Sequence, residues 1–248
     1  MNSFRAELHI HTVLSPCAGV EMIPPLIVRT AVSTGINLIA ITDHNASENV
    51  AAVIKAAQGE DLTVLPGMEL QTKEEVHVLC IFDTLEQLEK LQELVNHTLP
   101  DVPNNIEYFG EQFIVDQTGA FIRRKEQLLI NSTKLSIEEA EQAVHDLSGL
   151  FIPAHVNRQA FGLFYHLEFV PPDLNVDALE ISRHKTPETV LRDLPQIKGY
   201  PLIQSGDVHF LHDFLGVNQF RLHQPTIAEI KMALKGENGC SVEIVQPI

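Results

Sequence analysis

The sequence has few cysteines and no long apolar run. Its three cysteines, Cys17, Cys80 and Cys240, are odd in number and far apart, which argues against a disulfide framework and favours a reducing cytoplasm. No stretch approaches the about 20 apolar residues that span a bilayer. The first residues already carry Arg5 and Glu7, so they do not read as a signal segment. We therefore expect a soluble, cytoplasmic protein without a membrane partner.

Positive charge is also scarce, because 17 Lys and Arg residues stand against 33 Asp and Glu residues, a formal net charge of −16. A surface dominated by carboxylates repels the phosphate backbone and lacks the basic footprint of nucleic-acid binders. This argues against a long DNA or RNA partner. It leaves room for a small phosphorylated molecule or a short oligonucleotide, since bound divalent metals would reverse the local charge.

Two catalytic motifs and every sign of a second domain are missing from the sequence. There is no Gly-x-Ser-x-Gly elbow and no phosphate-cradling Gly-rich loop, which disfavours serine-hydrolase and P-loop chemistry. Internal repeats, low-complexity tracts and linkers are absent as well. With 248 residues, 44% of them hydrophobic, we expect one domain over residues 1–248.

Short motifs rich in His, Asp and Glu border apolar segments along most of the chain. They are His9-Ile10-His11, Asp43-His44, Gly67-Met68-Glu69, His77, His155 and Asp207-Val208-His209. In a strand, side chains at positions i and i+2 point the same way, so His9 and His11 can reach one point. Imidazole and carboxylate together suit Zn, Mn or Fe. We expect a shared metal site at the carboxyl ends of parallel strands, where barrel enzymes build active sites.

Apolar segments alternate with helical patterns, as in βα units. Strands are expected at residues 5–9, 35–42, 62–65, 76–82, 150–154, 178–181, 202–204 and 241–245. Helices are expected from residue 24, and at 47–58, 85–96 and 226–235. The segment 35–42 is almost entirely apolar, which is typical of a parallel strand buried on both faces.

The alternation breaks between residues 96 and 149. Pro100, Pro103 and Gly110 indicate irregular backbone, and residues 120–130 and 136–147 then read as helices, the second with a capping box. We interpret the segment as a mostly helical insertion within the domain. It is either a lid or wall of the substrate pocket or a structural addition.

In their residues and in their order along the chain, the motifs resemble those of the PHP (polymerase and histidinol phosphatase) superfamily of metal-dependent phosphoesterases. The matching stretches are His9-Ile10-His11-Thr12, Ile41-Thr42-Asp43-His44, Gly67-Met68-Glu69, Val76-His77-Val78-Leu79, Pro153-Ala154-His155-Val156 and Ser205-Gly206-Asp207-Val208-His209. The resemblance covers nearly the whole chain. It implies an α/β fold, a distorted (βα)7 barrel, with two or three divalent metals at its mouth.

The resemblance also implies a role for each motif residue. One metal would be held by His9, His11, Glu69 and Asp207, a second by Glu69 with His77 and His155, and a third by His44 and His209. Cys17 stands where many members place a third-metal His or Asp, so a zinc-binding thiolate and an inert cysteine both stay open. Asp43 would orient a ligand imidazole or shuttle a proton, and we favour the orienting role.

Positive side chains follow two of the expected strands. Arg158 comes three residues after His155, and Arg183-His184 follows the strand at 178–181. Guanidinium groups bind phosphate oxygens bidentately, so we expect these residues to hold a substrate phosphate, with a salt bridge at the barrel mouth as the alternative.

We therefore expect a phosphoesterase that hydrolyses a small phosphorylated metabolite or nucleotide by metal-activated water. Three alternatives stay open: a nuclease acting on short oligonucleotides, an amidohydrolase-like enzyme, and a metal-stabilised binding module without catalysis.

Overall fold

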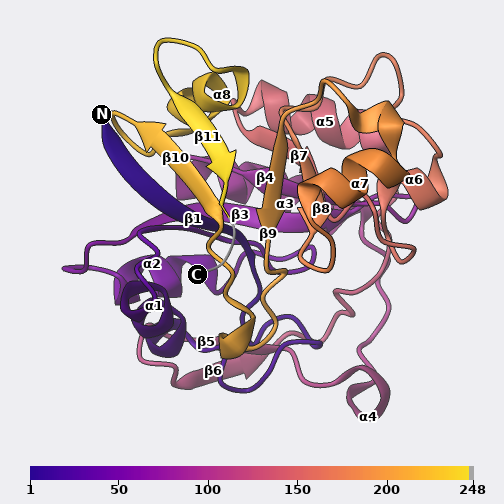
Figure 1. Cartoon of the computed structure of the whole chain (residues 1–248). Coiled ribbons are helices and arrows are strands. Elements are labelled where there is room, and N and C mark those ends of the chain that lie inside the picture. The colour runs from indigo at the N-terminus through magenta and orange to yellow at the C-terminus, as the bar shows by residue number, and fades with distance from the viewer. Residues whose placement is uncertain (246–248) are drawn as a thin grey trace.

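The computed structural model describes residues 1–245 and contains a curled seven-stranded sheet of order β11-β10-β1-β2-β3-β4-β7 (Figure 1). Its strands are β1 (Asn2–Ile10), β2 (Leu38–Ile41), β3 (Thr63–Gln71), β4 (His77–Ile81), β7 (Leu150–Pro153), β10 (Asn218–Leu222) and β11 (Ser241–Ile244). The last residues of the predicted domain, 246–248, lie outside the described part of the chain.

The sheet is mixed, so the prediction of purely parallel strands is wrong. β1, β2 and β3 are parallel, but β4 is antiparallel to β3, β7 is antiparallel to β4, and β10 is antiparallel to β1. The reason lies in the connection between β3 and β4, a tight turn in which Thr72 N donates to Val76 O and Glu75 has φ 62°. A turn this short can join only antiparallel neighbours.

A separate pair of parallel strands, β8 (Leu179–Ser182) and β9 (Leu202–Ser205), lies beside this sheet. A few backbone hydrogen bonds join the pair to the sheet on each side. Val156 N donates to Glu180 O after β7, and Val208 N, beyond β9, donates to His9 O of β1. The result is an α/β protein with a curled, mixed half-barrel sheet, consistent with the expected distorted barrel.

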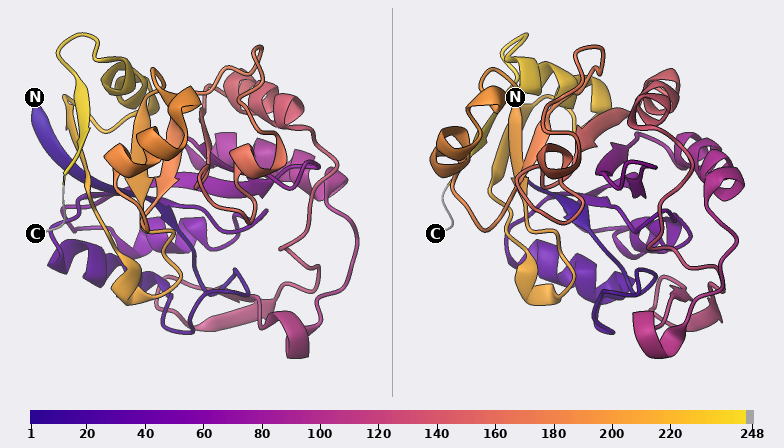
Figure 2. Two further views of the ribbon diagram at one scale, coloured as in Figure 1. Left: turned by 45° about the vertical axis from the view of Figure 1, so that its right-hand side comes forward. Right: turned by 90° about the vertical axis from the view of Figure 1, so that its right-hand side faces the viewer.

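Most of the helices lie around the outside of the strands (Figure 2). The helices of the described residues are α1 (Pro24–Ser33), α2 (Val50–Ala56), α3 (Leu85–Thr98), α4 (Ile106–Phe109), α5 (Ile137–Asp146), α6 (Leu163–His166), α7 (Pro187–Asp193) and α8 (Ile227–Lys235), with short 3-10 turns at Pro195–Ile197 and Leu211–Asp213. Reciprocal capping boxes start α3 and α5. Within residues 1–245 no helix has both the length and the apolar character needed to cross a membrane.

The apolar core has two layers because side chains alternate along the strands. On β2, Leu38 and Ala40 belong to an inner cluster with Leu8, whereas Ile39 and Ile41 belong to the outer cluster beneath the helices. The inner cluster includes residues of α8. Apolar side chains therefore fill the inside of the curled sheet, which leaves the polar motifs to gather at one end.

The segment from 96 to 149 is not mostly helical. The predicted helix at 120–130 is wrong, because residues Phe121–Arg124 form β6, which pairs with β5 (Phe113–Val115). The turn between these strands explains the difference, since Asp116 Oδ1 accepts hydrogen bonds from the backbone N–H groups of Thr118 and Ala120. Such an Asx turn closes a hairpin. The helix predicted at 136–147 is confirmed by α5.

Candidate metal centre

The eight side chains expected to bind metal lie together at one end of the curled sheet. A carboxylate oxygen of Glu69 lies 3.2 Å from His9 Nε2, 3.4 Å from His11 Nε2, 2.9 Å from His44 Nδ1, 2.9 Å from His77 Nδ1 and 3.2 Å from His155 Nε2. Asp207 Oδ1 lies 3.3 Å from His9 Nε2, 3.4 Å from His11 Nε2 and 3.4 Å from His209 Nδ1. Glu69 is therefore the central member of the cluster.

Not all of these side chains follow the carboxyl end of a strand, where a regular βα unit would place them. Glu69 lies inside β3, and His77 is the first residue of β4 rather than a residue after a strand. Because β4 runs antiparallel to β3, the start of β4 is at the same end of the sheet as the end of β3. His9 lies within β1, whose pairing with β2 shifts register between Glu7 and Ile10.

Two of the clustered residues have unusual backbone conformations. His155 has φ 30° and Asp207 has φ 49°, both in the left-handed region that non-glycine residues rarely adopt. Such conformations cost about 1–3 kcal/mol each and occur preferentially at functional sites. The backbone at these positions is consistent with a constraint imposed by the site.

Hydrogen bonds outside the cluster fix the orientation of three imidazoles. His9 Nδ1 lies 3.1 Å from Glu180 Oε1, and His11 Nδ1 lies 3.0 Å from Ser15 Oγ. His209 Nδ1 lies 2.9 Å from the backbone oxygen of Asp207. When Nδ1–H donates a hydrogen bond to each of these oxygens, the Nε2 atom of the ring keeps a lone pair that can bind a metal.

Glu180 and Glu7 are functional residues that the sequence interpretation missed. Glu180 is fully buried and also accepts a hydrogen bond from His155 N. Glu7, also fully buried, accepts from the backbone N–H groups of Gly206, Leu215 and Gly216, which fixes the segment that carries Asp207. The signal available in the sequence was a carboxylate within an apolar strand. Because an unpaired charge is rarely buried, such a residue is expected to have a buried partner.

Asp43 lies behind the cluster rather than in it. Its carboxylate accepts hydrogen bonds from Thr12 N at 2.7 Å, Thr12 Oγ1 at 2.8 Å and Ser15 Oγ at 2.7 Å. It is fully buried and does not line the cavities next to the cluster. This geometry favours the orienting role over proton shuttling. Ser15 Oγ, which donates to Asp43, also contacts His11 Nδ1, so His11 is the imidazole that Asp43 would orient.

The carboxylates of the cluster are held in the ionised form, which is the form that binds a cation. Burial opposes ionisation of Glu69, but the imidazoles of His77 and His9 outweigh it and hold its pKa well below the usual range. The pKa of Asp207 is likewise well below its usual range, because the nearby imidazoles outweigh burial. The imidazoles differ from one another. Burial lowers the pKa of His77 to about 4, whereas the carboxylates of Glu180 and Glu69 outweigh burial and raise the pKa of His9 well above its usual range. Metal binding at His9 would therefore displace a proton.

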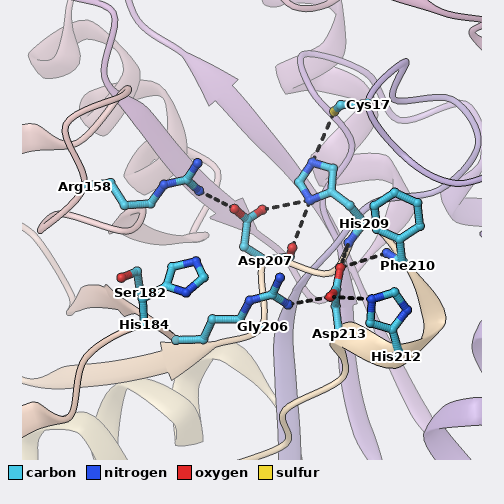
Figure 3. Close-up of a pocket in the computed structure, with 11 residues that line it drawn as sticks. Cys17, Arg158, Ser182, His184, Gly206, Asp207, His209, Phe210, His212 and Asp213 are labelled. Atoms are coloured by element: carbon cyan, nitrogen blue, oxygen red, sulfur yellow. Dashed lines mark hydrogen bonds and ion pairs between the residues drawn. The ribbon is translucent and has the colours of Figure 1, made fainter.

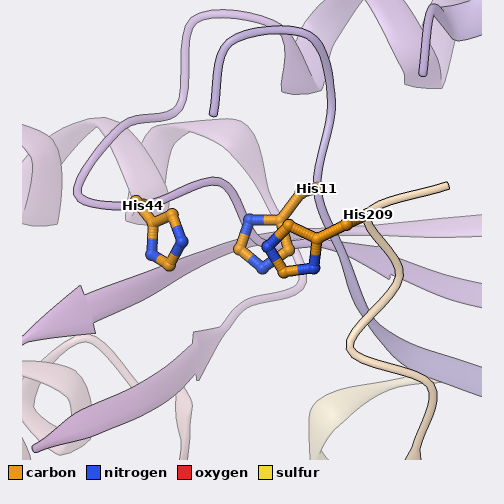
Figure 4. Close-up of side chains that lie close together, drawn as sticks. All are labelled: His11, His44 and His209. Atoms are coloured by element: carbon orange, nitrogen blue, oxygen red, sulfur yellow. The ribbon is translucent and has the colours of Figure 1, made fainter. Parts of the chain in front are cut away.

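Several buried polar atoms of the cluster have no hydrogen-bond partner among the described residues. They are His44 Nδ1, Glu69 Oε2, His77 Nε2 and His155 Nδ1. Buried polar atoms are nearly always paired, and two of these, His44 Nδ1 and Glu69 Oε2, lie 2.9 Å apart, which fits a cation bound by both. Three sets have ligand atoms within 4.8 Å of one another: His9-His11-Glu69, His44-Glu69-His77 and His11-His44-His209 (Figure 4). These sets fit a centre that holds more than one divalent metal.

Cys17 lies at the edge of the cluster, with Sγ 3.1 Å from His209 Nε2 (Figure 3). Desolvation opposes ionisation of the thiol, but the imidazoles of His44 and His209 outweigh it and lower the pKa of Cys17 to about 6. Cys17 is exposed, whereas Cys80 and Cys240 are buried. Burial of Cys17, which the alternative of an inert cysteine assumed, is therefore not found.

Two adjoining cavities of about 390 and 350 Å³ open beside the cluster and share Cys17, Arg158, Asp207 and His209. The larger cavity is also lined by Arg183 and His184. The smaller is lined by Phe109, Ile130 and Phe161. Phe109 and Ile130 come from the segment 96–149, so that segment forms part of the cavity wall.

The two arginines expected to hold phosphate each contact a carboxylate. Arg158 Nη1 contacts Asp207 Oδ2, and Arg183 Nη1 lies 2.7 Å from Asp213 Oδ1. Both arginines line the larger cavity, and Arg158 is labelled in Figure 3. The salt bridges that the sequence left as an alternative are present. Only Arg158 pairs with an expected metal ligand, so the two arginines are not equivalent.

Changing Asp43 to Asn is expected to weaken metal binding by about 10–100-fold, the usual effect of losing an outer hydrogen bond at a metal site. The amide would place N–H groups against donors from Thr12 or Ser15, which would release the His11 ring. Competition with a chromophoric chelator measures the affinity. The exposed Asp61→Asn variant is the matched control, and unchanged affinity in Asp43→Asn would show that Asp43 does not orient a ligand.

Known proteins share both the motifs and the fold of this chain. The PHP domain family profile matches residues 7–156. The uncharacterized protein YqxK of Bacillus subtilis (strain 168) is 22% identical over 271 residues, which cover 96% of this chain and 63% of YqxK. This chain thus spans less than two thirds of that relative.

Solved structures show the same fold. The lesion-specific endonuclease PfuEndoQ from Pyrococcus furiosus superposes with a TM-score of 0.75 and 22% identity, covering 97% of this chain and 58% of PfuEndoQ. A protein from Bifidobacterium adolescentis, described as a candidate metal-dependent phosphoesterase, superposes with a TM-score of 0.51 and 18% identity, covering 83% of this chain and 87% of that protein. The profile match, which spans more than half of the sequence, shows that the chain belongs to the PHP domain family.

Proposed function

We propose that this chain is a metal-dependent phosphoesterase that hydrolyses small phosphorylated metabolites or nucleotides. The observation that carries the proposal is the position of the His and carboxylate cluster, which opens onto a cavity lined by Arg158, Arg183 and His184. A cation site beside guanidinium groups suits a substrate with negative charge at its reacting end.

The residues present would hold two or three divalent metals, and Zn, Mn or Fe suits their donor atoms. The assignment is His9, His11, Glu69 and Asp207 for one metal, Glu69, His77 and His155 for a second, and His44 and His209 for a third. The chemistry that such metals supply is polarisation of phosphoryl oxygens and ionisation of water near neutral pH.

The side chains of the chain itself would position the substrate. Arg183 and Arg158 would exchange their carboxylate partners for phosphate oxygens, because both acceptors present the same planar pair of oxygens to a guanidinium group. Glu180 would keep the His9 ring in place, and Ser15 would do the same for His11. The apolar wall at Phe109, Ile130 and Phe161 would exclude water from the group attached to the phosphate.

A nuclease is the second candidate, because the fold is similar to that of PfuEndoQ, a lesion-specific endonuclease. The negative net charge argued against a long nucleic acid, but this similarity weakens that argument. The chain covers only 58% of PfuEndoQ. Cavities of about 390 and 350 Å³ suit a ligand of mononucleotide size, so we favour the small substrate.

A phosphate-release screen tests the proposal. Protein purified without chelators is analysed for bound elements and then assayed on sugar phosphates, amino-alcohol phosphates, nucleotides, dinucleotides and a duplex with an abasic site. We expect metal-dependent turnover with small phosphorylated compounds. Turnover of the duplex alone would favour the nuclease, and hydrolysis of esters or amides alone would favour the amidohydrolase-like alternative. Bound metal without turnover of any of these would favour the binding module.

Changing Arg183 to Ala is expected to lower kcat/KM on phosphoesters by about 1.5–3 kcal/mol of transition-state stabilisation, the usual contribution of a hydrogen bond to a charged group. Metal content is expected to stay constant, because Arg183 contacts Asp213 and not a member of the cluster. Steady-state kinetics and elemental analysis measure the two effects.

Arg192→Ala is the matched control, because Arg192 also pairs with one carboxylate but is exposed and lies outside the cavities. Arg158→Ala is a less clean test, since loss of its contact with Asp207 can also alter metal binding. If Arg183→Ala left the kinetics on every phosphoester unchanged, the assignment of Arg183 to phosphate binding would fail.

A further inference from the structure

The segment that carries Cys17 is fixed against the segment that carries His209. Gly19 N donates a hydrogen bond to His209 O at 2.8 Å, and Ala18 N donates to Ser15 O at 2.9 Å. These bonds hold the residues on the C-terminal side of Cys17. The contact between Cys17 Sγ and His209 Nε2 therefore depends on backbone structure and not only on the choice of a side-chain rotamer.

The nitrogen that faces Cys17 is the one suited to bind a metal. His209 Nδ1 donates its proton to the backbone oxygen of Asp207, so Nε2 carries a lone pair. Nε2 lies 3.1 Å from Cys17 Sγ. In a tetrahedral zinc site with Zn–S of about 2.3 Å and Zn–N of about 2.0 Å, these two atoms stand about 3.5 Å apart. A shift of a few tenths of an ångström would allow both atoms to bind one ion.

A buried histidine supplies an independent sign of a ligand at this place. His44 is 6% exposed, and its Nδ1 atom has no hydrogen-bond partner among residues 1–245, although it lies 2.9 Å from Glu69. Ligand atoms of His44, His11 and His209 lie within 4.8 Å of one another (Figure 4). The imidazoles therefore form a partial site on the side of the cluster where Cys17 lies.

We propose that Cys17 binds zinc together with His44 and His209, so that one position of the metal centre is a thiolate site. Thiolate is a soft ligand that favours zinc over Mn²⁺, whereas the remaining positions offer only imidazole and carboxylate. On binding, the thiol proton is released to solvent and the sulfur becomes a direct ligand. The metal positions then differ in their ligand atoms, and the position with the thiolate is selective for zinc.

Cobalt is the probe for this proposal, because Co²⁺ replaces zinc and absorbs in the near ultraviolet when bound to thiolate. Metal-free full-length protein is titrated with Co²⁺ alone. We expect a thiolate-to-cobalt absorption band that is lost in Cys17→Ser and retained in Cys80→Ser, since Cys80 is buried in the apolar core and does not line the cavities beside the cluster. A band that persists in Cys17→Ser, or that never forms in the wild-type protein, would overturn the proposal.

Metal content provides a second measurement that does not depend on catalysis. Zinc affinity at one position should fall by at least about 10–100-fold in Cys17→Ser, because loss of a direct ligand costs no less than loss of an outer hydrogen bond. Cys17→Asp should bind Mn²⁺ at that position without the absorption band. Equal zinc affinity in wild type and Cys17→Ser would count against the proposal. Because these measurements use no substrate, a failed phosphoesterase proposal would leave them unchanged.

Discussion

Changing Glu69 to Gln is expected to reduce the bound metal and to lower phosphate release by several orders of magnitude. Glu69 contacts five imidazoles and is 1% exposed, so its charge is the main anion at the centre of the cluster. Gln keeps the shape of the side chain but removes the charge that would offset two cations. Elemental analysis and the phosphate-release assay measure the two effects.

The matched control for this change is Glu60→Gln, because Glu60 is an exposed carboxylate outside the cavities. Circular dichroism and the midpoint of thermal unfolding should show that Glu69→Gln still folds. Normal turnover and normal metal content in a folded Glu69→Gln protein would rule out a bridging role for Glu69.

Removal of metal with a chelator is expected to abolish phosphate release and to lower the free energy of unfolding. Ions that bind only the folded chain stabilise it by about 2.7 kcal/mol per site at a free concentration 100 times Kd. Without metal ions, the ionised carboxylates of Glu69 and Asp207 stay buried and lose the cations that offset their charge. Urea unfolding with and without chelator measures the change, and added zinc or manganese should restore both properties.

The Glu69→Gln variant is also the control for this experiment. Its unfolding midpoint should move little when chelator is added, since it starts with less metal. If the wild-type protein unfolded at the same urea concentration with and without chelator, the cluster would not be a stabilising metal centre, and its role would have to be argued from other contacts.

Local sequence signals predicted most elements of the fold because they depend on few residues. The capping box at the start of α5 involves residues three apart, and the apolar segment at 35–42 identified the buried strand β2. The hairpin of β5 and β6 was missed because residues 120–130 have a helical pattern. The turn before them depends on hydrogen bonds to one side chain, Asp116. Short strands such as β10 lacked a distinctive period.

The identity of the candidate ligands was available in the sequence, but their arrangement was not. His9, His11 and Glu69 were selected because few other roles suit such residues beside apolar segments. The antiparallel course of β4, which brings His77 to the same end as Glu69, follows from a short turn and required the tertiary structure. So did Glu180, since only its contact with His9 shows why a carboxylate is buried in β8.

The sequence by itself therefore determined the residue types of the metal centre and the α/β class, because motif order and side-chain periodicity are properties of the chain. Tertiary structure decided which atoms face one another: Glu69 against five imidazoles, Asp43 behind Ser15, and Cys17 beside His209. These contacts join residues that are distant in the chain. Distances across a fold depend on strand direction and backbone conformation, and a linear pattern does not encode them residue by residue.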